Sequence, residues 1–190
     1  DPGTTDCKDL TNESTGTIVL KGVINSTSHT GEAPDLRVGG VVGHLNCDVN
    51  GASNYANLTF TGKASTTYYG GGVVGYATTA ALTSFTNNAT TTTFNGEGTL
   101  QFYVGGVGGW VEKGDVTTIT NNSKVVFNMS APTGKANNTG EAQYNGCMMG
   151  GVFANLGLLT ESTLYKAKDI TNNGQIDINS SNVKGDFIYI

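Results

Sequence analysis

The side chains best suited to chemistry in this chain are aromatic, and they recur at matching places beside double glycines. They are His44, Tyr69, Tyr76, Tyr103 and Trp110. Flat rings spaced along a sheet can stack on sugar rings or anchor a protein interface. The same rings could instead pack beneath loops or simply coat a strand-rich surface. They are therefore candidate ligand-binding residues, with a glycan or a host or cell-surface protein as the partner.

Residues for catalysis are sparse. His29 and His44 are the only histidines and no G-x-S-x-G motif occurs, so a serine or cysteine triad has little to work with. The carboxylates are scattered, and Glu112 with Asp115 is the closest cluster outside the N-terminal segment. A polysaccharide-degrading enzyme would need carboxylates converging on one face with basic support. We expect no catalytic residue and no enzymatic activity.

Cofactor motifs are equally weak. Gly70, Gly72 and Gly75 fit the G-x-G-x-x-G dinucleotide fingerprint, but no helical pattern follows them and they belong to a repeat. Calcium-binding loops of the glycine-aspartate nonapeptide type are absent. We therefore expect no nucleotide, metal or other cofactor.

Composition restricts the class of partner. The net charge is -5, which argues against a nucleic acid and against an anionic membrane surface. No apolar run approaches the roughly 18 residues of a transmembrane helix, so we expect no membrane insertion. No signal peptide opens the chain, and Asp1 looks like a mature or excised start. Abundant Thr, Ser and Asn with 28 glycines are typical of strands and turns.

Two motifs repeat along the chain. Double glycines begin at Gly39, Gly71, Gly105 and Gly150, and Asn-rich turns such as "FTNNATTTTF" lead into alternating strands. This predicts one domain over residues 1–190 with repeat units near 7–46, 47–77, 78–111, 112–156 and 157–190. The fold class is all-β, a parallel β-helix or β-solenoid of about five coils with about three short strands each. Loops such as 27–35 and 131–145 would project outward, and the only plausible helix is around Leu158 to Lys168.

Equivalent positions of the repeats form columns, and the residues in each column predict whether its side chains face inward or outward. Uniform apolar or tiny columns should face inward. These include the columns of Val41, Gly43 and Leu45, and of Leu36 before the glycines. Variable columns should face outward. They are His44, Tyr76, Trp110 and Asn155 after the glycines, and Arg37, Tyr69, Tyr103, Met148 and Tyr189 before them. Both assignments hold only if the glycine pair forms a bulge or corner.

The motif Gly-Gly-Val-Val-Gly, followed by a turn and a "TNN-G-x-I-x-I" segment, resembles the GLUG repeat of bacterial surface proteins, common in Bacteroidetes adhesin-like chains. The resemblance covers nearly the whole sequence. Val41 and Val73 stand where that motif has Leu, and the fourth copy has Phe153 and Ala154 in place of Val and Gly. The resemblance implies an extracellular repeat module and carries over no catalytic residue.

Cysteines and asparagines predict contacts between coils. Cys7 precedes Gly22 by as many residues as Cys47 precedes Gly62, so the two occupy the same place in adjacent coils. Stacked neighbours lie about 5 Å apart, near the Cα separation of a disulfide. A Cys7–Cys47 bond is predicted, consistent with an oxidising compartment, and a pair of reduced thiols is the alternative. Cys147 should be a buried free thiol. The Asn of the turns should bond to turn backbone and to one another in ladders.

These observations favour a non-catalytic extracellular repeat module of a cell-surface adhesin or stalk that spaces and presents a binding surface. The alternatives are a carbohydrate-binding module using the aromatic residues and a β-helical polysaccharide-degrading enzyme. The final "GDFIYI" matches segments that run into a double glycine elsewhere. We therefore expect the chain to be a secreted, mature fragment of a longer protein, with flanking domains of that protein as further partners.

Overall fold

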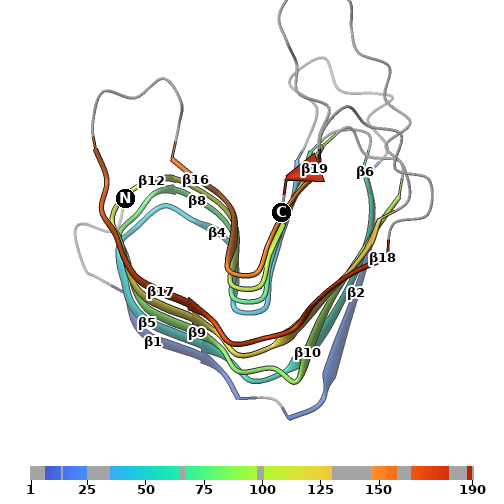
Figure 1. The fold of residues 1–190 in the computed structure, drawn as a ribbon, viewed down its shortest axis with the longest axis horizontal. Coiled ribbons are helices and arrows are strands. Elements are labelled where there is room, and N and C mark those ends of the chain that lie inside the picture. Colours follow the sequence, from blue (N-terminus) through green and yellow to red (C-terminus); the bar gives the residue numbers. More distant parts are fainter. Residues whose placement is uncertain are drawn as a thin grey trace, which may run out of the picture.

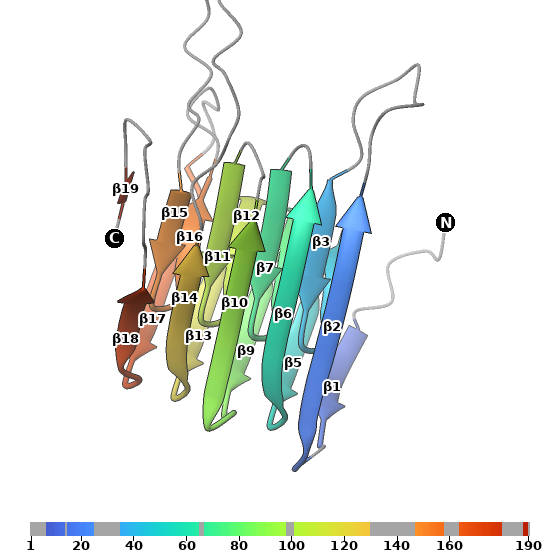
Figure 2. The same cartoon turned by 90° about the vertical axis from the view of Figure 1, so that its right-hand side faces the viewer.

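The structure is a computed structural model of the chain. It describes residues 7–13, 15–24, 35–64, 67–97, 101–129, 147–157, 164–179 and 188–189. The regular secondary structure of these residues is all strand. Strands from successive turns of the chain stack side by side and in parallel (Figure 2). The predicted parallel β-solenoid of five coils is confirmed.

The strands of the described residues form four sheets, here named A to D. Sheet A contains β1 (Cys7–Asn12), β5 (Val49–Asn54), β9 (Leu82–Asn87), β13 (Val116–Asn121) and β17 (Ala167–Asn172). Sheet B contains β2 (Thr17–Ile24), β6 (Asn57–Ala64), β10 (Thr91–Glu97), β14 (Lys124–Met129) and β18 (Ile176–Asn179). Sheet C contains β3 (Leu36–Gly39), β7 (Thr67–Gly71), β11 (Gln101–Gly105), β15 (Cys147–Gly150) and β19 (Ile188–Tyr189). Sheet D contains β4 (Val42–Leu45), β8 (Val74–Thr79), β12 (Gly108–Lys113) and β16 (Phe153–Leu156).

Each complete coil has four strands, where about three were expected. Viewed along the stack, sheets A and B form an outer V, and sheets C and D form a narrower V nested inside it (Figure 1). The extra strand arises because the chain bends sharply at each double glycine, between β7 and β8 for example. The predicted corner at the glycines is confirmed.

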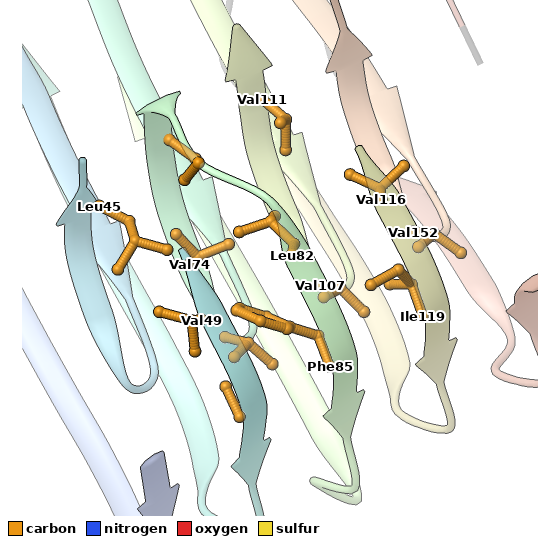
Figure 3. Close-up of a cluster of buried hydrophobic side chains, with 14 residues drawn as sticks. Leu45, Val49, Val74, Leu82, Phe85, Val107, Val111, Val116, Ile119 and Val152 are labelled. Atoms are coloured by element: carbon orange, nitrogen blue, oxygen red, sulfur yellow. The ribbon is translucent and has the colours of Figure 1, made fainter. Parts of the chain in front are cut away.

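Two hydrophobic cores run along the stack. The first lies between sheets A and D, where Val49, Leu82 and Val116 form one stacked column (Figure 3). The second lies between sheets B and C and contains stacked Phe60, Phe94 and Phe127. In sheets B and C every second side chain faces a core, as the sequence pattern predicted, for example Phe102 and Val104 in β11. In sheet A the core residues lie three positions apart instead, for example Leu82 and Phe85 in β9.

A ladder of asparagines separates the two cores at the corner between sheets A and B. Its rungs are Asn12, Asn54, Asn87, Asn121 and Asn172. Each Nδ2 donates to the Oδ1 of the next rung, over 3.1 Å from Asn54 to Asn87 and 2.8 Å from Asn121 to Asn172. The three middle side chains are fully buried. The predicted asparagine ladder is confirmed.

The double glycines exist because backbone and side chains crowd the bend. A methyl group on Gly72 would overlap the carbonyl oxygen of Gly106 in the next coil and the amide nitrogen of Asn87. A methyl group on Gly75 would lie 2.6 Å from Val38 N on the facing strand. The prediction that the Gly43 column faces a core is therefore wrong: Gly43 and Gly75 face the backbone of sheet C, which only glycine allows to approach so closely.

Sheet A carries one left-handed residue in every strand. The φ angles are 53° at Asp9, 94° at Gly51, 59° at Ser84, 58° at Thr118 and 55° at Asp169. These residues occupy the third position of their strands and are skipped in the strand pairing. Left-handed backbone is costly for side chains branched at Cβ, so Thr118 is held there by the coils on either side.

The structure describes only parts of the expected helix and of the expected projecting loops. Of the stretch considered as a helix, residues 164–166 have no regular structure and Ala167 and Lys168 begin β17, so helix is wrong for these residues. Residues 158–163 lie outside the described residues, as do His29 and most of the expected projecting loops.

Candidate functional site

The two variable columns predicted from the sequence face each other across the bend between sheets C and D. Sheet C contributes the stacked residues Arg37, Tyr69, Tyr103 and Met148. Sheet D contributes the stacked residues His44, Tyr76, Trp110 and Asn155. The backbone of Tyr189 continues the first column, and its side chain lies outside the described part of the structure. Both columns point away from the two hydrophobic cores.

Four rings from these columns pack into one cluster, which we call the aromatic seam: Tyr69, Tyr76, Tyr103 and Trp110. Tyr69 and Tyr103 are stacked, with ring centroids 5.4 Å apart and planes inclined by 17°. Across the bend, the centroid of Tyr76 is 4.7 Å from that of Tyr69, and the centroid of Trp110 is 4.8 Å from that of Tyr103. The seam therefore joins sheet C to sheet D with aromatic contacts.

Exposure divides the predicted binding residues into two groups. His44 is exposed, and Tyr76 and Trp110 are half-buried. Tyr69 and Tyr103 are buried, at 8% and 6% exposure, so the prediction that their column faces outward into solvent is wrong. The sharp glycine bend brings sheet D over that column, and the rings of Tyr76 and Trp110 cover it.

The tyrosine hydroxyls of the seam stay protonated over a wide pH range. Burial raises the pKa of Tyr69, Tyr76 and Tyr103 above the ordinary value. Tyr76 also donates its hydroxyl proton to Glu112 Oε2 over 2.5 Å, and the carboxylate raises its pKa further. Glu112 thus holds a ring of the seam in place.

At the first coil, the aromatic seam ends at a hydrogen-bonded polar group made of Arg37, His44 and Thr78. The guanidinium carbon of Arg37 lies 4.5 Å from the ring centroid of Tyr76, and Nη1 lies 3.2 Å from His44 Nδ1. Because a guanidinium only donates, His44 Nδ1 must accept, and Nε2 then donates to Thr78 Oγ1 at 2.6 Å. Partial burial and the positive charge of Arg37 lower the pKa of His44. The neutral imidazole is the form that fits this network.

The carboxylates considered for catalysis have separate structural partners. Glu112 binds Tyr76, whereas Asp115 Oδ1 accepts a hydrogen bond from the backbone N–H of Lys166 at 2.8 Å. Asp48 Oδ1 accepts the equivalent hydrogen bond from the backbone N–H of Ala81, two coils earlier in the stack. Among the described residues, no group of three or more His, Cys, Asp or Glu side chains could hold a metal ion.

The two predicted disulfide partners lie side by side as free thiols. The Sγ atoms of Cys7 and Cys47 are 3.8 Å apart. Strand pairing sets Cys7 against Val49 rather than Cys47, so the expected identity of position is wrong by two residues. The thiols still meet because Cys7 N binds Asp48 O in the corner before β5. Burial and the Cys7 thiol raise the pKa of Cys47. The side chain of Cys147 lies outside the described residues.

Sequence reasoning found the residues of the seam but missed its geometry and the role of Glu112. The facing geometry could have been inferred from the sequence, because two variable columns on either side of a tight bend must face each other if both avoid the cores. No family model matches the sequence, and searches of curated proteins and of solved structures find no match either. In the part of the chain that the structure describes, no helix has the length and apolar character to cross a membrane.

Proposed function

We propose that this chain is a non-catalytic repeat module of an extracellular surface protein, an adhesin or stalk, that spaces and presents a binding surface. The observation that carries the proposal is the unbroken asparagine ladder, which links all five coils between two continuous cores. Hydrogen bonds between side-chain amides join every pair of neighbouring coils, fully buried in the middle of the ladder and partly buried at its ends, and they resist sliding and bending. A stack of this kind holds whatever follows it at a set distance.

The surroundings of the ionisable groups support a non-catalytic role. Glu112, Asp115 and Asp48 each accept a structural hydrogen bond. Asp177 pairs with Lys124 over 2.6 Å. A hydrolase or lyase would direct such groups at a substrate instead.

Parallel cleavage and binding assays test this proposal. The chain would be incubated with neutral and acidic polysaccharides while product release and retention on the immobilised polymer are measured. Retention on at least one polymer without product release is expected. Product release that disappears in Glu112→Gln would overturn the proposal, because that variant removes the only carboxylate bonded to the seam among the described side chains. Product release that survives in Glu112→Gln would overturn it equally and would place the catalytic groups elsewhere.

A second candidate function is carbohydrate binding along the seam. The observation that favours it is the half-buried pair of Tyr76 and Trp110, which occupy paired positions on neighbouring strands beside the exposed His44 and meet edge to face, with their planes inclined by 77°. Neighbouring strands are about 4.8 Å apart, so the ring edges form a row along the stack.

A glycan array with matched ring deletions tests the second candidate. Trp110→Ala and Tyr76→Ala should abolish binding, whereas Tyr55→Ala should leave it unchanged. Tyr55 is 48% exposed at the corner between sheets A and B, far along the coil from the seam. Equal loss in all three variants, or no loss in Trp110→Ala, would exclude the seam as the binding surface.

A further inference from the structure

The polar group of Arg37, His44 and Thr78 covers the first-coil end of the aromatic seam. The guanidinium of Arg37 lies over the ring of Tyr76, with its carbon 4.5 Å from the ring centroid. The ring of His44 lies beside the same tyrosine, with the two ring centroids 5.4 Å apart. These contacts are made within the first coil or between the first and second coils. Tyr76 is therefore shielded at this end by two side chains that can both carry a positive charge.

One proton decides whether this cover holds together. Arg37 Nη1 donates to His44 Nδ1 over 3.2 Å, so that nitrogen must offer its lone pair. A proton on Nδ1 would turn the acceptor into a donor and set two positive charges side by side. His44 Nε2 donates to Thr78 Oγ1 at 2.6 Å in either form, because the protonated ring keeps that N–H. Protonation therefore breaks the bond to Arg37 and leaves the bond to Thr78.

Arg37 has a second partner toward which it can turn. Its Nη2 lies 3.4 Å from Asp35 Oδ2, and the two side chains form an ion pair. A guanidinium released by His44 can move toward this carboxylate, whereas His44 stays anchored to the second coil through Thr78. Because the two cations repel each other, the guanidinium is the group that leaves the ring of Tyr76.

The described side chains around this pair that carry a charge or titrate are two carboxylates and two tyrosines: Asp35, Glu112, Tyr69 and Tyr76. Burial raises the pKa of both tyrosines, so their hydroxyls stay neutral wherever histidine titrates. Partial burial and the charge of Arg37 lower the pKa of His44, so the closed cover is the form present at neutral pH. Histidine is the side chain that normally changes charge between about pH 8 and about pH 5.

We propose that Arg37 and His44 form a pH-operated cover on the aromatic seam. In neutral solution the His44 imidazole holds the guanidinium over Tyr76. In acid the protonated imidazole drives the guanidinium toward Asp35, and one face of the Tyr76 ring becomes open. The contacts among Tyr69, Tyr103 and Trp110 remain, because they do not involve the cover.

The cover rests on neither proposed function. It would make the second candidate function depend on pH, because a sugar ring could stack on the uncovered face of Tyr76 in acid. That consequence rests on carbohydrate binding along the seam, whereas the opening itself is measured without any ligand.

Hydroxyl-radical footprinting read by tandem mass spectrometry tests the opening at Tyr76. Tyr55 is 48% exposed at the corner between sheets A and B and serves as the internal reference. From about pH 8 to about pH 5, oxidation of Tyr76 relative to Tyr55 should rise about twofold or more, because the ring loses the guanidinium above it. His44→Gln can still accept from Arg37 and donate to Thr78 but cannot be protonated, so its ratio should stay at the neutral value.

Titration of His44 by nuclear magnetic resonance tests its coupling to Arg37. His29 is the only other histidine in the sequence, so a His29→Gln chain assigns the resonances of His44. The pKa of His44 should lie below the ordinary value of 6.5 and move up toward it in Arg37→Met, because the neighbouring positive charge is gone. The oxidation ratio of Tyr76 should no longer depend on pH in that variant. A merely structural role for Arg37 would not move the midpoint.

Four results would overturn the proposal. A constant ratio at Tyr76 while His44 titrates would show that the charge of His44 does not move the cover. An equal rise in His44→Gln would assign the opening to another group. A midpoint unchanged in Arg37→Met would show that the two side chains are not coupled. Loss of the far-ultraviolet circular dichroism signal together with the rise at Tyr76 would show that the whole stack unfolds instead.

Discussion

The burial of the asparagine ladder predicts that removing a rung from its middle lowers the free energy of unfolding far more than removing the rung at its end. Asn87 is fully buried and its side chain has five hydrogen-bond partners. The two N–H groups of Nδ2 are shared among three acceptors, Thr92 Oγ1, Gly106 O and Asn121 Oδ1, and Oδ1 accepts from Ala89 N and Asn54 Nδ2. Replacement by alanine leaves the Gly106 carbonyl and the Ala89 N–H buried without these partners. Each buried polar group without a partner costs about 1–3 kcal/mol.

We therefore expect Asn87→Ala to lower the free energy of unfolding by about 4 kcal/mol, including the small cavity left by the amide. Asn172→Ala is the matched control, because it removes the same side chain from an exposed rung where water replaces the lost partners. It should cost about 1 kcal/mol or less.

Urea unfolding measures both values, followed by far-ultraviolet circular dichroism and by fluorescence of the single tryptophan, Trp110, in the seam. The two signals should change together in each variant if the stack unfolds as one unit. Equal losses in the two variants, or a loss below about 1 kcal/mol for Asn87→Ala, would refute the reasoning, because burial would then not decide what the ladder contributes.

Three further predictions follow from the bend, the polar group beside the seam, and the thiols. Gly72→Ala should destabilise the fold by about 3 kcal/mol in urea unfolding, because its methyl group overlaps backbone of the next coil; an unchanged midpoint would contradict the steric account of the double glycine. The pKa of His44 is lowered in the fold, so the unfolded chain binds more protons, and stability should be lost as pH falls below 6.5. Thermal melts should show a larger drop in Tm on acidification for the natural chain than for His44→Gln, and equal drops would remove His44 as the cause. Oxidation by glutathione disulfide should join Cys7 to Cys47 with loss of two hydrogens, seen by peptide mass spectrometry with Cys47→Ser as control; mixed disulfides without the internal bond would contradict the 3.8 Å sulfur separation.

Local and repeated features were predictable from the sequence. Alternation marked the core side of strands such as β10, and the recurring glycine pair marked a corner. The Asn-rich turns indicated a ladder, because a parallel stack sets like residues beside one another and an amide can both donate and accept. These inferences needed only the period of a strand and the register of a repeat.

Tertiary structure alone decided where the outward faces lie relative to one another. The two-residue period of side chains along a strand shows which face of the strand avoids the core. It does not show whether that face meets water or another sheet of the same coil. Tyr69 and Tyr103 were expected in solvent and are buried, because the glycine bend folds sheet D over sheet C. The bond from Tyr76 to Glu112 joins residues of neighbouring coils that no spacing rule connects. The sequence determined the repeating coil. The aromatic seam was determined by the direction in which the coil bends, because that direction depends on close backbone contacts between distant strands.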